Sequence, residues 1–116
     1  MIKISDNEGE LLAIKYLQEN KFKILERNYQ ARPGEIDIIA SKKGVIHFIE
    51  VKLRSNEGFG EPEEYVTPSK LKKIQKTAQY YLYSIDGYGQ ECQFDVIAIF
   101  KTEKAYKIKH FDNVTG

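Results

Sequence analysis

The chain is poor in the residue types that cross-link small domains through disulfides or structural metal ions. Its 116 residues include 1 cysteine, 3 prolines, 2 histidines and no tryptophan. A lone Cys92 excludes an internal disulfide, and His47 and His110 are too far apart in sequence for the ligand spacing of a structural zinc site. We therefore expect a domain held together by an apolar core, in a reducing, cytoplasmic compartment.

The chain also lacks a strong net charge and a long apolar run. Its 18 basic and 17 acidic residues leave a formal charge of +1, which excludes indiscriminate coating of nucleic acid and requires that any such contact come from a local patch. The first residues lack the apolar run of a signal peptide, and no stretch reaches transmembrane length, so we expect no membrane contact. The length predicts a single domain spanning residues 1–116.

Two apolar runs, 35–40 and 45–53, predict adjacent strands. Between them, Ser41–Gly44 is typical of a hairpin turn. Apolar side chains occupy both faces of the second run, which indicates a central strand covered on both sides. Each run carries charge inside the apolar pattern: Asp37 in the first, Glu50 and Lys52 in the second.

The rest of the chain predicts two helices and three more strands. We expect a helix from the Ser5 capping box to about Asn20, and a second from Thr67-Pro68 to Ile85. Their predicted buried stripes are Leu11, Ala13, Ile14 and Leu17, then Leu71, Ile74, Ala78, Leu82 and Ile85. Further strands are expected at 22–29, 93–100 and 105–111, with a mobile loop at 54–66 and fraying after 111. The order, αβββαββ, predicts an α/β mixed central sheet flanked by helices, in which a helix crosses from strand three to strand four.

The charged residues of the two central strands suit phosphodiester cleavage. Magnesium prefers oxygen ligands and is commonly held by one or two carboxylates, here Asp37 and Glu50, with the Val51 carbonyl as a third ligand. Lys52 lies two residues after Glu50, hence on the same face, where its ammonium can orient water or offset charge on a phosphate. The alternative is an ordinary charged pair at an exposed strand edge. Glu19 and Lys21 have the same spacing at a helix end, where we expect no function.

Glu10 lies in the middle of the apolar arc of the first helix. A carboxylate there must find a partner or stay protonated, and reaching towards the metal would satisfy it. The alternative is a locally hydrogen-bonded glutamate near a helix N-terminus, where the helix dipole favours negative charge. Both interpretations fit the sequence.

Basic residues gather on the second predicted helix. Lys70, Lys72, Lys73 and Lys76, interleaved with Tyr80 and Tyr83, can contact phosphates and stack on bases, and we assign Arg54 to the same nucleic-acid-binding role. A solvated helix face is the alternative explanation of this run. For His47, His110 and Cys92 we expect packing or surface roles, and for Asp95 a core residue that satisfies backbone groups.

The residues 34–40 and 48–54 resemble the YraN-like bacterial family. Further matches are Gly9-Glu10, residues 27–29, Val66-Thr67, Ser69-Lys70 and residues 93–96, so the similarity spans nearly the whole chain. The resemblance implies membership of the restriction-endonuclease-like, PD-(D/E)xK nuclease superfamily, closest to archaeal Holliday-junction resolvases. Ile36 precedes Asp37 where the superfamily's name has proline.

Carried over by position, the resemblance implies metal ligands at Asp37 and Glu50, a catalytic lysine at Lys52, and a catalytic and metal-binding glutamate at Glu10. It also implies a core sheet flanked by helices and is compatible with a homodimer. We therefore expect an endonuclease dependent on Mg²⁺ or Mn²⁺ that acts on DNA, with branched or structured DNA as the expected class. The alternatives are a nucleic-acid-binding module that does not cut, and an interaction subunit of a DNA-processing complex.

Overall fold

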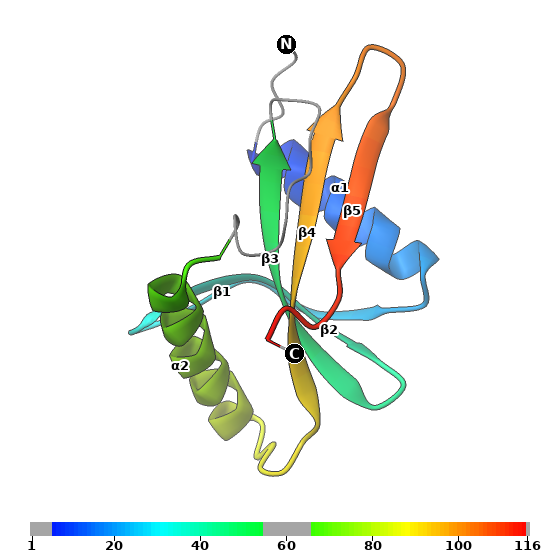
Figure 1. Cartoon of the computed structure of the whole chain (residues 1–116). Helices are drawn as coiled ribbons and strands as arrows, with labels where there is room; N and C mark the ends of the chain where they lie inside the picture. Colours follow the sequence, from blue (N-terminus) through cyan, green and yellow to red (C-terminus); the bar gives the residue numbers. More distant parts are fainter. Residues whose placement is uncertain (1–5, 55–65, 116) are drawn as a thin grey trace.

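The computed structural model describes residues 6–54 and 66–115 (Figure 1). The elements are, in chain order, α1 Asp6–Glu19, β1 Lys23–Ala31, β2 Gly34–Lys42, β3 Val45–Arg54, α2 Pro68–Ser84, β4 Cys92–Lys101 and β5 Tyr106–Phe111. Every helix and strand predicted from the sequence is present within a few residues of its expected ends. The predicted capping residue Ser5 and the predicted loop between β3 and α2 fall largely outside the described residues.

The five strands form one mixed sheet in the order β1-β2-β3-β4-β5. Neighbouring strands are antiparallel except β3 and β4, which are parallel. This parallel pair confirms the predicted crossover through α2, since parallel strands cannot be joined by a tight turn. The β2–β3 turn is at Lys43 and Gly44, whose φ angles of 50° and 80° are those of a tight hairpin turn.

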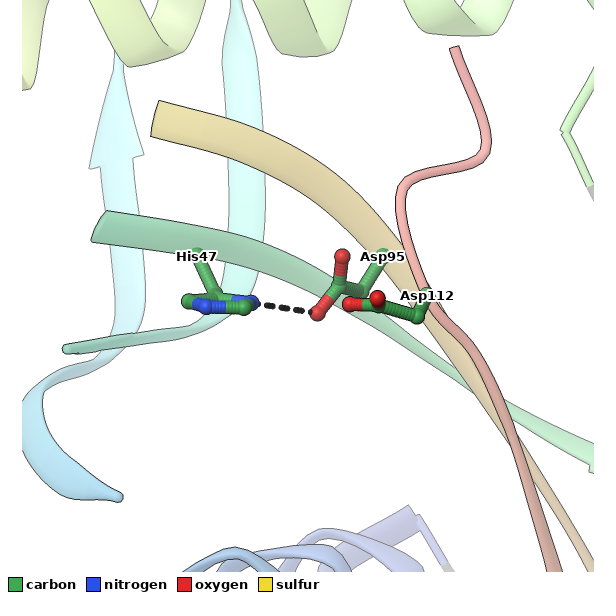
Figure 2. A group of neighbouring side chains, drawn as sticks. All are labelled: His47, Asp95 and Asp112. Atoms are coloured by element: carbon green, nitrogen blue, oxygen red, sulfur yellow. Dashed lines mark hydrogen bonds and ion pairs between the residues drawn. The ribbon is translucent and has the colours of Figure 1, made fainter. Parts of the chain in front are cut away.

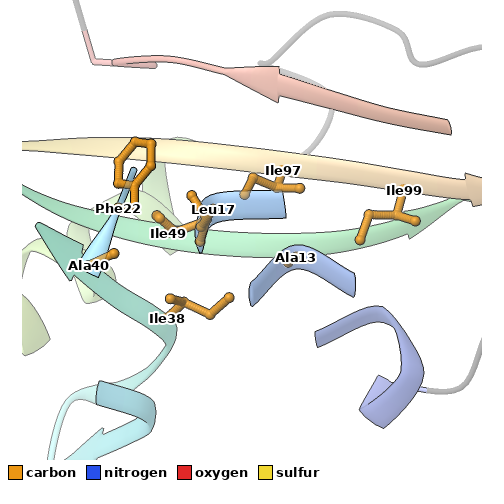
Figure 3. Close-up of a cluster of buried hydrophobic side chains, with 8 residues drawn as sticks. All are labelled: Ala13, Leu17, Phe22, Ile38, Ala40, Ile49, Ile97 and Ile99. Carbon is orange, nitrogen blue, oxygen red and sulfur yellow. The ribbon is translucent and has the colours of Figure 1, made fainter. Parts of the chain in front are cut away.

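Each face of the sheet has its own hydrophobic cluster. Ala13 and Leu17 of α1 pack on Ile38, Ile49 and other side chains of one face (Figure 3). On the other face, α2 packs on a second cluster, which contains Ile36, Ile39, Ile46, Phe48, Ile74, Ala78 and Tyr81. Figure 1 shows α2 beside β1 and β2, and α1 crossing the sheet near β3 and β4. The central strands are therefore covered on both sides, as their composition predicted.

Two residues that were predicted to be buried on the helices, Leu11 and Ile85, are exposed. Leu11 is 48% exposed, and the line of α1 that meets the sheet runs through Gly9, Ala13 and Leu17 instead. A Cβ on Gly9 would lie 2.3 Å from Leu53 Cδ2, so this helix approaches β3 too closely for a larger residue without rearrangement. Ile85 is 45% exposed because α2 ends one residue before it.

The prediction that the chain frays after residue 111 was wrong. The segment after β5 is hydrogen-bonded to the sheet. The Val114 amide donates a hydrogen bond of 2.7 Å to the Phe94 carbonyl, and Val114 packs against Val96 and Ala98. The Asn113 amide donates to the Asp95 carboxylate at 2.9 Å. These contacts hold Asp112 beside β4, where it joins a group of side chains described below.

Candidate functional site

The predicted site lies where β2 and β3 stop pairing. Their ladder runs from Lys42 and Val45 to Ile38 and Ile49, and no further pair joins them beyond that point in the described residues. Asp37 and Glu50 are the next residues on either strand. Each strand remains paired on its outer side, β2 with β1 and β3 with β4. The sheet thus opens between two well-anchored strands, and the two carboxylates lie in this fork.

A change in side-chain direction accompanies the fork. Residues two apart in a strand normally share a face, yet Ile36 packs in the cluster under α2 while Ile38 packs in the cluster under α1. Glu50 and Lys52 lie on the side of Phe48, which belongs to the cluster under α2. The strand β2 therefore changes the facing of its side chains at Asp37.

Asp37 accepts a hydrogen bond from a backbone amide of β3 and lies beside a second carboxylate, that of Glu50. The Val51 amide donates a hydrogen bond of 2.8 Å to Asp37 Oδ2. Burial, together with the like charge of Glu50 and a side-chain hydrogen bond to it, raises the pKa of Asp37 to about 7. The two carboxyl groups are therefore close enough to disfavour a second negative charge, as predicted from the hairpin. Glu35 adds a smaller repulsion of the same sign.

Two lysines compensate the charge of Glu50. Glu50 Oε1 lies 3.6 Å from Lys52 Nζ and 3.2 Å from Lys70 Nζ, and the Glu50 side chain is 12% exposed. Burial and a hydrogen bond with Lys70 lower the pKa of Lys52. For Lys70, burial acts in the same direction, but the hydrogen bond with Lys52 and the attraction of Glu50 raise its pKa. Lys52 is thus the amine that gives up its proton more readily.

Lys70 was predicted as part of the basic helix face, and the structure places it in the fork. It stands in the first turn of α2, which brings its amine beside Glu50. Sequence separation concealed this contact, because α2 follows a long connection whose course the sequence does not fix. The N-cap at Thr67, recognised from the sequence, is the feature that fixes the position of Lys70: the Lys70 amide donates to Thr67 Oγ1 at 3.2 Å.

The backbone of Val51 faces the fork. In a strand, the N–H and C=O of one residue point towards the same neighbouring strand, and the Val51 N–H points to Asp37 on β2. Its carbonyl is therefore directed to the side on which β3 has no ladder partner. This orientation is the one that the predicted ligand role of Val51 requires.

Glu10 is bonded elsewhere. Its Oε1 accepts hydrogen bonds from Arg27 Nε at 3.0 Å and Asn28 Nδ2 at 2.9 Å, both on β1. Within residues 6–54 and 66–115, Glu10, Asp37 and Glu50 do not form a group of three ligands whose atoms all lie within 4.8 Å of one another. Glu10 thus has its hydrogen-bond partners on β1, 17 and 18 positions along the chain, which is neither the predicted metal contact nor the local hydrogen bond of the alternative.

The outer face of α2 carries the other predicted basic residues. Lys72, Lys73 and Lys76 are exposed, as are Tyr80 at 51% and Tyr83 at 71%. A groove of about 730 Å³ runs between this helix and the β1–β2 turn, lined by Arg32, Pro33, Lys76, Gln79, Tyr80 and Tyr83. Arg54 ends β3, two residues beyond Lys52 and on the same face by strand alternation.

A second polar cluster lies on the side of the sheet covered by α1 and was missed from the sequence. Asp95 is its centre: Oδ2 accepts from His47 Nδ1 at 2.7 Å and from His110 Nε2 at 2.9 Å. Oδ1 accepts from Gln93 Nε2 and from the Asn113 amide, each at 2.9 Å. Burial alone would raise the pKa of Asp95, but these four hydrogen bonds hold it well below its usual range.

Of this cluster, the sequence predicted only the bond between Asp95 and a backbone group. Asp95 does bind a backbone group, as predicted, but packing does not fully describe His47 and His110, which both contact its carboxylate. The sequence held one usable signal, an aspartate inside the apolar strand 94–100. Its partners come from β3 and β5, and no local spacing relates them.

Among the described residues, neither helix is long and apolar enough to cross a membrane.

Over the described ranges 6–54 and 66–115, fold and site together define a mixed α/β domain with a five-stranded sheet, two helices and a carboxylate and lysine group at a fork between two strands. Residues 9–99 match the family described as "Uncharacterised protein family UPF0102". The chain belongs to this family, which confirms the resemblance to YraN-like proteins.

Several bacterial relatives carry the same family name. The chain is 46% identical over 96 residues to a UPF0102 protein of Persephonella marina, with 83% of each chain covered. It is 44% identical over 105 residues to one of Syntrophomonas wolfei, covering 90% of this chain and 91% of the relative. To UPF0102 protein FP2501 of Flavobacterium psychrophilum it is 40% identical over 105 residues, covering 90% and 87%.

Proposed function

We propose that this protein is a metal-dependent endonuclease acting on DNA, with a restriction-endonuclease-like, PD-(D/E)xK arrangement of its sheet. The observation that carries the proposal is the fork: two carboxylates from adjacent strands meet beside two lysines, and all four are partly or largely shielded from water. Phosphodiester cleavage requires neutralisation of the phosphate charge and an activated water, and this set of groups is suited to both.

The donor set fits Mg²⁺ or Mn²⁺. Asp37 and Glu50 would hold the ion with carboxylate oxygens, and the Val51 carbonyl faces the same space. The raised pKa of Asp37 supports this fit, because a divalent cation would relieve the repulsion that causes it. A bound ion of this class supplies a Lewis acid and a water of lowered pKa.

The lysines have separate roles in this proposal. Lys52, whose pKa is lowered, is deprotonated in a larger fraction of molecules than an ordinary lysine, and only the neutral amine can take a proton from the attacking water. Lys70, whose pKa is raised, keeps its charge and stabilises the negative charge on the scissile phosphate. Their contact with each other and with Glu50 holds both amines at the fork.

The basic and aromatic face of α2 would position the nucleic acid. Lys72, Lys73 and Lys76 offer phosphate contacts, and Tyr80 and Tyr83 offer exposed rings along the groove next to Arg32. Arg54 would contact the backbone beyond Lys52. Unpaired bases at a branch point or flap can stack on such rings, which favours branched DNA over uninterrupted duplex.

Cleavage of labelled duplex, flap and four-way-junction DNA with Mg²⁺ or Mn²⁺ tests the proposal. We expect Asp37→Asn, Glu50→Gln and Lys52→Met each to lower the rate by at least about a hundredfold, as typical for loss of acid–base or electrostatic groups. The chain offers a matched control: Glu19→Gln and Lys21→Met change the same triplet spacing at the end of α1, away from the fork. These controls should retain wild-type activity.

Equal cleavage by the wild type and by the three fork variants would identify a contaminant and remove the catalytic assignment. Absence of cleavage on all three substrates, with metal bound, would remove it as well.

The groove on α2 supports a second candidate, a nucleic-acid-binding module that does not cut. In that case DNA binding measured by fluorescence anisotropy should survive chelation of the metal and the change Glu50→Gln. It should fall when Tyr80 and Tyr83 are replaced by serine, because base stacking depends on the rings.

A further inference from the structure

A group of possible metal ligands lies on the opposite side of the sheet from the fork. One ligand atom each from His47, Asp95 and Asp112 lies within 4.8 Å of the others. Figure 2 shows the three side chains converging from β3, β4 and the segment after β5. We propose that this group binds a transition-metal ion of the zinc class, separate from the proposed magnesium site.

The spacing of the donor atoms suits such an ion. Ligand atoms about 2.0–2.2 Å from a tetrahedral zinc ion stand roughly 3.4 Å from one another. The ligand atoms of His47, Asp95 and Asp112 already lie within 4.8 Å of one another, so small movements would bring them to that spacing. His47 Nδ1 and Asp95 Oδ2 are now 2.7 Å apart, joined by a hydrogen bond. An ion entering between them replaces that hydrogen bond and requires the two atoms to move apart by roughly 0.7 Å.

The ligand types distinguish this site from the fork. Imidazole nitrogen together with carboxylate oxygen suits zinc and neighbouring transition metals, whereas all-oxygen sets suit magnesium. Asp37, Glu50 and the Val51 carbonyl supply only oxygens. The two proposed sites should therefore select different ions from the same solution.

The site is built into the fold and is open on one side. The Asp95 side chain is 0% exposed and that of His47 is 9% exposed, while Asp112 is exposed. A cavity of about 410 Å³ reaches His47, His110 and Asp112, with Tyr16, Phe22 and Lys42 along its wall. An ion can enter through this cavity, and water can complete its coordination there.

Neighbouring groups orient the ligands. His110 Nε2 contacts Asp95 Oδ2 at 2.9 Å, while its Nδ1 pairs with the Tyr16 hydroxyl at 3.0 Å. Gln93 Nε2 hydrogen-bonds to carboxylate oxygens of both Asp95 and Asp112. Such outer contacts fix the direction of ligand side chains and commonly change metal affinity about 10–100-fold when removed.

Binding of the ion has a structural consequence. Asp112 follows β5, whereas His47 and Asp95 lie on β3 and β4. A shared ion ties the end of the chain to the central strands, in addition to the amide hydrogen bonds of Asn113 and Val114.

Titration of the full chain with ZnCl₂ tests this proposal, by calorimetry and by NMR of the imidazole nitrogens. The chain has 2 histidines, so each resonance is assignable with one His→Gln variant. We expect one equivalent of zinc to shift the His47 signals, and Asp112→Asn to weaken binding at least about tenfold. Asp112 is exposed, so this change leaves the folded core intact, which far-UV circular dichroism verifies.

Three controls separate this site from other zinc-binding groups. Asp37→Asn with Glu50→Gln removes the fork carboxylates, Cys92→Ser removes the thiol on the other face, and Glu103→Gln changes an exposed acid in the β4–β5 turn. All three should bind zinc as the wild type does. Absence of zinc binding, or equal binding by wild type and Asp112→Asn, overturns the proposal and leaves the cluster as a hydrogen-bond network.

Discussion

At the scale of single residues, the fork places opposing demands on Asp37. Burial and the neighbouring Glu50 raise its pKa to about 7, so ionisation at neutral pH costs free energy in the folded state. The same carboxylate in an unfolded chain ionises near its ordinary pKa of 3.8. The ionised form of Asp37 is thus unfavourable in the folded protein by itself, and a bound cation would make it favourable.

The linkage predicts that Asp37→Asn stabilises the protein. The folded wild type holds the Asp37 proton between pH 4 and pH 7 while the unfolded chain has released it, so wild-type stability falls as pH rises through that window. Since Asp37 is only partly buried, we expect the variant to gain about 1–3 kcal/mol at pH 8, less than the full pKa difference implies. Urea denaturation between pH 4 and pH 8 measures this gain.

The expected gain should grow from pH 4 to pH 7 and level off above it. The control Glu19→Gln, an exposed change on α1, should show no such trend. A gain that is independent of pH would contradict the raised pKa. Saturating Mg²⁺ at pH 8 should narrow the difference by stabilising the wild type alone, because only the wild type keeps both carboxylates.

At the scale of elements, the first turn of α2 links a stability feature to the proposed site. Thr67 caps the helix through its hydroxyl, Pro68 follows at the first helical position, and Lys70 reaches Glu50 from the same turn. Fraying of this turn would withdraw the Lys70 amine from the fork. The position of a charged group therefore depends on a local capping interaction.

We expect Thr67→Ala to lower the free energy of unfolding by about 1 kcal/mol, the typical value of an N-cap side chain. Thr67→Ser keeps the hydroxyl and should lie within a few tenths of wild type. Urea denaturation of both variants measures the difference. If alanine and serine at this position are equivalent, the cap contributes nothing and the link to Lys70 fails.

At the scale of the whole molecule, charge is nearly balanced but unevenly placed. The net charge is +1, yet Lys72, Lys73 and Lys76 share the exposed side of one helix beside the groove with Arg32. Association with a polyanion would therefore be directed to this face.

Replacing Lys72, Lys73 and Lys76 by glutamine should weaken DNA binding and reduce the slope of log K against log salt by about 2–3, close to one unit for each phosphate contact. The matched control replaces Lys15, Lys23 and Lys104, exposed lysines of α1, β1 and the β4–β5 turn. Anisotropy titrations from 50 to 200 mM salt measure both slopes. An equal loss in the two triple variants would show that only overall charge matters.

The sequence by itself determined the elements, their order, and the pairing of Asp37, Glu50 and Lys52. These depend on short-range signals: alternation within strands, a turn at Lys43 and Gly44, and a threonine and proline at a helix start. A hairpin brings residues from adjacent strands together whatever the rest of the chain does. The two carboxylates were therefore predictable as neighbours.

Only the tertiary structure decided which distant groups meet them. Lys70 joins the fork, Glu10 turns to Arg27 and Asn28, and His47 meets Asp95 across 48 positions of sequence. These contacts follow from the packing of helices on the sheet and from the parallel register of β3 and β4. Such packing minimises exposed apolar area over the whole molecule, and no local pattern records its outcome.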